Sequence, residues 1–187
     1  FKFDQVISEL VASGYLGNLI SIELRATTPG FVEQNGPLAW RHDRELSGYN
    51  IMTMGIWYEA LMRWVGPASR VPAMTSVSAK RRVDRAGATR TVTIPDHVDV
   101  LCQMAMGVQA HLAFSAVTGL APGGEAWLFG SEGTLHLEMA TQTLFGGKRG
   151  DKTLAPIEVP AEKQGSWRVE EEFIRAIRGE EQITRTS

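Results

Sequence analysis

The sequence has few of the features that mark disulfide-rich, membrane or nucleic-acid-binding proteins. Its 187 residues include one cysteine, Cys102, so an intrachain disulfide and a cysteine-only zinc site are excluded. No run of about 18 apolar residues occurs, which argues against a transmembrane helix. The 19 basic and 21 acidic side chains leave a net charge of −2, without the basic excess of nucleic-acid binders. We therefore expect a cytoplasmic protein that binds neither membrane nor nucleic acid.

Motifs for common cofactors and metals are also missing from the sequence. There is no G-x-G-x-x-G between a strand and a helix, no G-x-x-x-x-G-K-[ST] and no H-E-x-x-H. The histidines lie far apart in the sequence and form no local metal pair; they are His42, His97, His111 and His136. We expect no metal site and no cofactor-binding residues in this chain.

Hydrophobic periodicity divides the first third of the chain into a helix, a strand, a loop and a second helix. Apolar residues three and four apart predict helices over 4–13 and 50–65, and alternation predicts a strand over 19–26. Asn50 is the candidate N-cap of the second helix. The glycines and prolines of 28–49 predict a long loop, which contains Arg41 and His42.

From Val71 onward the period changes to two, which is typical of strands. Six to eight consecutive strands are predicted between 71 and 159, with Met106-Gly107 and Gly146-Gly147 among the turns, and a helix over 167–178. Strands that follow one another without intervening helices indicate an α+β fold. We expect one domain built on a large, mainly antiparallel open β-sheet, with helices packed on one face.

Several motifs, taken in their order along the chain, resemble the glucose–fructose oxidoreductase and inositol dehydrogenase family, known as Gfo/Idh/MocA. They are Gly14-x-x-Gly17 before a strand, Pro37-Leu38-Ala39-Trp40-Arg41, Ser47-Gly48 before a helix that ends in Arg63-Trp64-Val65-Gly66, Gly130-Ser131-Glu132-Gly133-Thr134-Leu135 and Val169-Glu170-x-x-Phe173-x-x-Ala176-Ile177-x-Gly179. The resemblance extends over nearly the whole chain.

The resemblance implies that residues 1–187 are a single C-terminal domain for substrate binding and oligomerisation, without the family's N-terminal Rossmann domain. The full-length protein would be an oxidoreductase that uses NAD or NADP and acts on a sugar, a polyol or a similar small molecule. The cofactor would be bound mainly by the missing domain, which also holds the family's lysine beside the nicotinamide. The open sheet face would pair with a second subunit in a dimer or tetramer.

The chain departs from the family where an Asp and a His usually lie four residues apart on the helix after the glycine-rich turn. Thr53 and Trp57 occupy these positions, and neither side chain can take a proton from an alcohol. Three interpretations remain open. The base comes from the missing lysine, from Glu59 or from His42; Trp57 stacks on a sugar ring; or the protein is a non-catalytic relative that binds a ligand or a partner.

The candidate substrate-binding residues are therefore Arg41, His42, Asn50, Thr53 and Trp57, and no catalytic residue is assigned. Each candidate also has an ordinary structural explanation. Helical spacing alone places Trp57 in a core, and Asn50 at the start of a helix is typical of a cap. Arg41 and His42 lie in a long loop, and long loops in compact domains are often functional.

Overall fold

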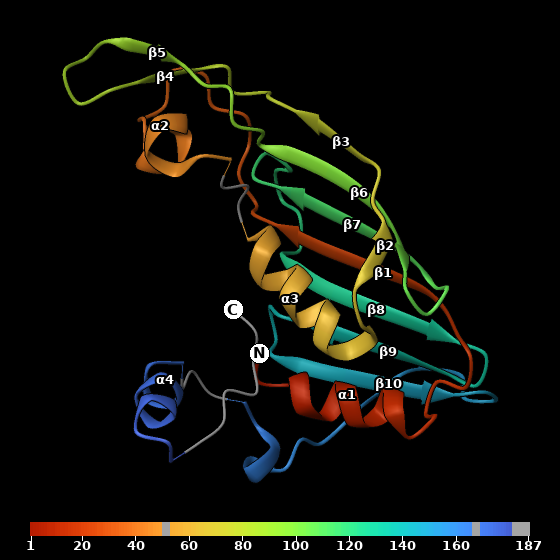
Figure 1. Cartoon of the computed structure of the whole chain (residues 1–187). Coiled ribbons are helices and arrows are strands. Elements are labelled where there is room, and N and C mark those ends of the chain that lie inside the picture. The colour runs from red at the N-terminus through yellow and green to blue at the C-terminus, as the bar shows by residue number, and fades with distance from the viewer. Residues whose placement is uncertain (50–52, 166–168, 181–187) are drawn as a thin grey trace.

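A nine-stranded sheet dominates the computed structural model of the chain, which describes residues 1–49, 53–165 and 169–180 (Figure 1). Its strands are β1 (Leu19–Thr27), β2 (Ala68–Arg70), β3 (Ala73–Ser76), β6 (His97–Met104), β7 (Gln109–Ser115), β8 (Gly124–Gly130), β9 (Gly133–Glu138), β10 (Thr143–Lys148) and β11 (Ala155–Pro156). The strand order is β11-β10-β9-β8-β1-β7-β6-β2, and β3 also pairs with β6. All pairs are antiparallel except β1 with β7. The predicted α+β fold is confirmed.

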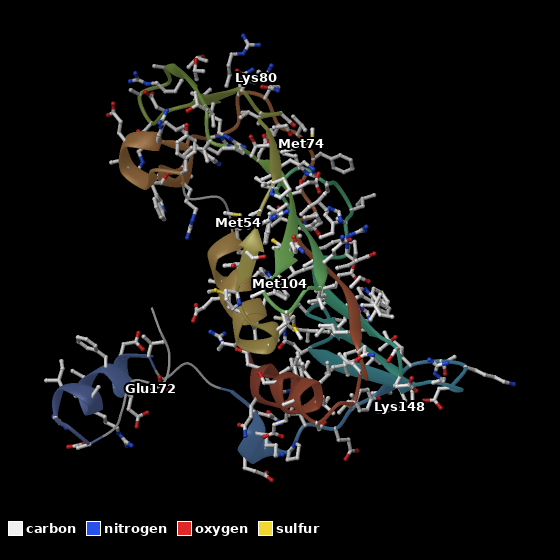
Figure 2. The ribbon with its side chains drawn as sticks, turned by 45° about the vertical axis from the view of Figure 1, so that its right-hand side comes forward. Met54, Met74, Lys80, Met104, Lys148 and Glu172 are labelled. Atoms are coloured by element: carbon white, nitrogen blue, oxygen red, sulfur yellow. The ribbon has the colours of Figure 1, made fainter. Side chains whose placement is uncertain are left out.

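Two helices, α1 (Asp4–Ala12) and α3 (Met54–Val65), lie side by side on one face of the sheet (Figure 1). A side chain of α1, Asp4, links them: it accepts hydrogen bonds from the Arg63 guanidinium at 2.6 Å and from Trp64 Nε1 at 3.1 Å. Figure 2 shows Met104 of β6 between α3 and the sheet, where it is buried. The core therefore lies between this helix pair and one sheet face.

Alternation along the strands decides which side chains enter the core. In β6, Val98, Val100, Cys102 and Met104 are buried, whereas Leu101 is 59% exposed on the opposite face. The same pattern continues in β1 and β7. Side chains of one strand alternate between the two faces of a sheet, so the second face carries the other half of each strand. None of the described helices covers that face (Figure 2).

A smaller unit lies beyond the N-terminal end of α3 (Figure 1). It contains the 3-10 helix η1 (Trp40–His42), the short helix α2 (Arg44–Ser47) and a hairpin of β4 (Arg81–Val83) with β5 (Thr89–Thr91). A second 3-10 helix, η2 (Ala161–Lys163), precedes α4 (Val169–Ile177). Helix α4, which carries Glu172, lies away from the sheet (Figure 2). None of the helices in the described ranges has the length and hydropathy needed to cross a bilayer.

The structure corrects several predicted boundaries. Gly146 and Gly147 are not a turn but part of β10. A Cβ at Gly146 would lie 2.7 Å from the Tyr15 hydroxyl, and one at Gly147 would lie 2.9 Å from a Leu154 methyl. Close packing therefore accounts for these glycines. The second helix begins at Met54, after its N-cap Thr53, and Asn50 lies outside the described residues.

Candidate functional site

The N-terminal end of α3 carries the two positions at which the sequence departs from the family pattern. Thr53 is the N-cap residue; it is exposed, and its side chain makes no capping hydrogen bond. Trp57 is only 5% exposed. Its ring lies 4.7 Å from the ring of Phe1, and a Cβ at Gly124 would lie 2.7 Å from its Cζ2 atom. This burial favours the core interpretation of Trp57 over a surface on which a sugar stacks.

Arg41 and His42 lie together on η1. The Arg41 side chain is exposed, and its guanidinium stacks 4.5 Å above the Trp40 ring. The half-buried His42 folds back on its own helix: its Nδ1 accepts a hydrogen bond from the Ala39 backbone N–H at 3.0 Å. Because Nδ1 is the acceptor, the neutral imidazole carries its proton on Nε2.

The charge state of His42 agrees with this hydrogen bond. Burial lowers the pKa of His42, the nearby positive charge of Arg82 lowers it further, and Asp96 only partly opposes them. His42 is therefore neutral near pH 7, and its basic nitrogen is already occupied by a backbone donor. The side chain can donate from Nε2 to a ligand oxygen, but it is poorly placed to accept a proton.

The short helix α2 is fixed by its own sequence. Asp43 is the N-cap and accepts a hydrogen bond from the Glu45 backbone N–H at 2.9 Å, while Ser47 Oγ donates to the Arg41 carbonyl at 3.2 Å. The Arg44 guanidinium stacks 4.4 Å above the Tyr49 ring. η1 and α2 thus present two guanidinium groups, each lying over an aromatic ring, and guanidinium groups can donate to hydroxyl or carboxylate oxygens.

Four large apolar side chains of these elements are exposed. They are Trp40, Leu46 and Tyr49 of the η1–α2 unit and Ile56 on α3. Exposed apolar side chains on the same elements as charged groups are typical of a surface that meets a ligand or another protein unit. The structure therefore groups Arg41 with His42, and Thr53 with Trp57, on two neighbouring elements (Figure 1). It shows no direct contact between the two pairs among the described residues.

Glu59, the remaining candidate base of α3, is not free. Its carboxylate forms an ion pair with the Arg63 guanidinium at 2.5 Å, one helical turn away. The Oε1 atom of this carboxylate is therefore already occupied by a guanidinium donor. Among the residues that the structure describes, no group of three or more His, Cys, Asp or Glu side chains is arranged to hold a metal ion.

Sequence reasoning missed two clusters on the open sheet face. Asp99 lies between His97 and His111, with its oxygens 2.9 and 3.1 Å from their Nε2 atoms. Glu125 Oε2 lies 3.1 Å from Trp127 Nε1 and 3.2 Å from His136 Nε2. Alternation along each strand placed these residues on one face, but only the register between strands brings them together.

Comparison with known proteins gives a family and a fold. Residues 5–136 match the family described as GFO/IDH/MocA C-terminal domain. No curated protein sequence matches the chain. Among solved structures, levoglucosan dehydrogenase in complex with NADH and L-sorbose is similar with a TM-score of 0.78 and 16% identity, over 96% of this chain and 55% of that one.

Two further structures show the same fold. A NAD-binding oxidoreductase from Klebsiella pneumoniae has a TM-score of 0.70 and 19% identity, over 81% of this chain and 42% of its own. A super-repressor mutant of Gal80p from Saccharomyces cerevisiae has a TM-score of 0.74 and 16% identity, over 100% of this chain and 52% of its own. The chain thus spans about half the length of the structures that it resembles.

Proposed function

Because the chain belongs to the family of Gfo/Idh/MocA C-terminal domains, we propose that it is the substrate-side and oligomerisation domain of an NAD(P)-dependent oxidoreductase. The substrate would be a sugar, a polyol or a similar hydroxylated small molecule. The observation that carries the proposal is the exposed surface around Thr53 and η1, where hydrogen-bond donors alternate with apolar side chains. The complexes of levoglucosan dehydrogenase with NADH, L-sorbose and levoglucosan support the same classes of cofactor and substrate.

In this reaction the carbon that bears the hydroxyl loses a hydride to the nicotinamide, and the hydroxyl loses its proton to a base. This chain offers no suitable base among the candidates. Thr53 does not ionise near neutral pH, Glu59 is paired with Arg63, and Nδ1 of His42 is occupied. We assign the base to the N-terminal Rossmann domain, which lies outside this chain and would also bind NAD or NADP. The chain itself would orient hydroxyl groups through Arg41, His42 Nε2–H and Thr53.

The test uses the full-length protein. NADH and NADPH are titrated by fluorescence, and a panel of sugars and polyols is then screened for reduction of the bound cofactor by absorbance. Nicotinamide binding with turnover of any panel member supports the proposal. The absence of nicotinamide binding would exclude an oxidoreductase.

Variants then test the surface. Arg41→Ala and Thr53→Val should raise KM for the substrate at least several-fold and leave nicotinamide affinity unchanged. Arg85→Ala, on the exposed β4–β5 turn, is the matched control for removal of a surface arginine. Equal KM values in Arg41→Ala, Thr53→Val and Arg85→Ala would remove this surface from the proposal. The isolated domain should show no dehydrogenase activity.

The second candidate is a non-catalytic module that binds a ligand or a partner. Two observations favour it: Thr53 and Trp57 stand where the family usually has an acid–base pair, and the fold is shared with Gal80p. Nicotinamide binding without turnover across the whole panel would support this alternative.

We also propose that the chain forms a homo-oligomer, a dimer or a tetramer, through its open sheet face. A large apolar side chain on that face, Leu101 of β6, is 59% exposed. A face of this kind is usually either solvated and polar or buried against another unit. The single cysteine supports a cytoplasmic location. Sedimentation of the full-length protein at micromolar concentration tests the assembly, and a monomer would contradict it.

A further inference from the structure

Backbone hydrogen bonds join the β4–β5 hairpin to the element that carries His42. The segment 35–38 lies beside β4 like an additional strand: three backbone hydrogen bonds of 2.8–3.0 Å connect the two, and Pro37 pairs with Val83 in parallel. The next residue along the chain is Ala39, whose N–H donates to His42 Nδ1. The donor that orients the His42 ring therefore lies at the end of a segment that the hairpin holds.

The hairpin is in turn anchored to the large sheet. Asp96, the residue directly before β6, accepts hydrogen bonds of 2.8–3.0 Å from the backbone N–H groups of Ser78 and Ala79, which precede β4. Three apolar side chains are buried at this root of the hairpin: Ala79, Val92 and Ile94. A connected path thus runs from the sheet, through Asp96 and β4, to the N–H group that binds His42.

Arg82 of β4 is the side chain of the hairpin that lies against this segment. A Cβ at Gly36 would be 3.1 Å from Arg82 Nη1, and Glu33 Oε2 would be 3.2 Å from the same point. Arg90, the cross-strand neighbour of Arg82, is paired with Asp84 at 2.8 Å. The buried Nε atom of Arg82, in contrast, has no hydrogen-bond acceptor among the residues that the structure describes. Such a guanidinium acts mainly through its charge on the groups around it.

Two charged groups of the hairpin act on His42 from outside η1. Burial is the largest cause of the lowered pKa of His42; the charge of Arg82 lowers this pKa further, and the charge of Asp96 acts in the opposite direction. The charged neighbours of His42 in the chain have other partners. Arg41 stacks on an aromatic ring, and Asp43 caps α2. The hairpin therefore supplies both the contact that orients the His42 ring and the charges that influence its protonation.

We infer that Arg82 and Asp96 are positioning residues of the candidate substrate site, through which the β4–β5 hairpin holds His42 as a hydrogen-bond donor. The inference rests on the proposed function, in which His42 Nε2–H binds a substrate hydroxyl. Neither positioning residue needs to touch the substrate. Asp96 anchors the hairpin that presents the Ala39 N–H to Nδ1, and this hydrogen bond leaves the ring proton on Nε2. Arg82 keeps the ring neutral.

Protonation of His42 would undo this arrangement. Both ring nitrogens of an imidazolium are donors, so Nδ1–H would face the N–H of Ala39. Because two donors in this position repel each other, the ring would leave its place and carry Nε2–H away from the ligand. Substrate affinity should therefore fall as pH drops through the pKa of His42. Arg82 moves this fall to lower pH, and Asp96 moves it to higher pH.

Two substitutions with opposite expected signs test the inference in the full-length protein. An NMR titration with isotope-labelled histidine measures the proton affinity of His42, and His42→Asn identifies its signal. The nitrogen chemical shifts also show which ring nitrogen carries the proton. Arg82→Met removes the positive charge and should raise the proton affinity of His42 at least about twofold. Asp96→Asn removes the negative charge, keeps an oxygen acceptor for the backbone N–H groups and should lower that affinity.

Two further variants control for damage to the hairpin. Arg81→Met is the matched control, because Arg81 is the exposed neighbour of Arg82 on β4, and it should leave the titration of His42 unchanged. Arg82→Lys keeps the positive charge and should titrate like the parent protein. A hairpin that had merely become less stable would not shift the proton affinity of His42 in opposite directions in Arg82→Met and Asp96→Asn.

The KM for a substrate found in the sugar and polyol panel is then measured as a function of pH. In the parent protein KM should rise at least several-fold as pH falls through the pKa of His42. The rise should begin at higher pH in Arg82→Met and at lower pH in Asp96→Asn. The pH dependence of kcat should be the same in all variants, because the base lies outside this chain in the proposed reaction.

Failure of this inference is distinct from failure of the proposed function. Proton affinities that stay unchanged, or shift in the same direction in Arg82→Met and Asp96→Asn, overturn the positioning of His42. Opposite shifts with KM profiles that do not follow them overturn its role in substrate binding. A full-length protein that binds no nicotinamide loses the proposed activity, and the NMR titration then still supports or overturns the effect of the hairpin on His42.

Discussion

The contact between Trp57 and Gly124 offers a direct test of the core beside the candidate site. A Cβ at Gly124 would lie 2.7 Å from Trp57 Cζ2 and 3.2 Å from Met139 Cγ. Carbon atoms pack best at about 3.5 Å or more, so the Trp57 contact would be about 0.8 Å too short. Gly124 lacks a positive φ, so steric overlap rather than backbone strain opposes a side chain there. We expect Gly124→Ala to destabilise the protein by about 1–3 kcal/mol.

A double-mutant cycle separates this contact from other effects. Trp57→Phe shortens the side chain at the point of overlap and leaves room for the new methyl group. The cost of Gly124→Ala should therefore be smaller in the Trp57→Phe background, by about 1 kcal/mol or more. Urea unfolding followed by far-UV circular dichroism measures all four free energies of unfolding, because this signal does not depend on the tryptophan itself. Equal costs of Gly124→Ala in both backgrounds would refute the steric explanation.

Gly55→Ala is the matched control for this experiment. Gly55 lies two residues from Trp57 on the same helix, has no atom within 4 Å of its added Cβ and has no positive φ. Alanine is a better helix former than glycine by about 1 kcal/mol. Gly55→Ala should leave the free energy of unfolding unchanged or raise it, and a loss as large as that of Gly124→Ala would show that position 124 is not special.

Three further predictions concern charged groups. Since the pKa of His42 is lowered, the free energy of unfolding should fall as pH drops through about 6.5, and His42→Asn should flatten this dependence in urea titrations at several pH values. Arg63→Met should destabilise by about 1–3 kcal/mol because the partly buried Asp4 loses its guanidinium partner. Arg149→Met, in a more exposed pair, should cost below about 1 kcal/mol in thermal unfolding. Burial acts to raise the pKa of Asp99, but hydrogen bonds from His97 and His111 lower it overall. The parent protein should therefore be more stable than Asp99→Asn in urea titrations. This difference should be complete above pH about 3.9 and disappear as pH falls through the lowered pKa.

Periodicity predicted the strands of the sheet well, but it predicted poorly where each strand ends and a turn begins. The period of two after Val71 predicted consecutive strands, and the structure has them; in β6, Val98, Val100 and Cys102 lie on the buried face. The same rules read Gly146-Gly147 as a turn, because glycine marks turns far more often than strands. Tyr15, whose hydroxyl packs against Gly146, comes from a distant part of the chain. Such long-range contacts leave no local signal in the sequence.

At the candidate site, too, the sequence predicted where side chains lie along the chain but not what surrounds them. Helical spacing placed Thr53 and Trp57 on one side of α3 but left the environment of Trp57 open. Burial beneath Gly124 and Phe1 depends on how α3 crosses the sheet, which spacing does not determine. The role of His42 depended on one hydrogen bond from Ala39, which orients the ring and selects its tautomer. Residue type alone predicted a possible base, whereas the geometry describes a hydrogen-bond donor.

The surroundings of the candidate residues decide which of them could take a proton in the proposed reaction. Trp57 fills a space matched to Gly124, so a proton acceptor at position 57 would leave a cavity as well as a buried polar group. The other candidates, Glu59 and His42, already have partners for the atoms that would take the proton. What remains at the surface are groups that donate or stack: the Arg41 guanidinium, the His42 Nε2–H and the Thr53 hydroxyl. Among the described candidates no side chain is left free to take a proton, which agrees with our proposal that the base belongs to the Rossmann domain. We therefore expect activity of the full-length protein to depend on a residue outside this chain.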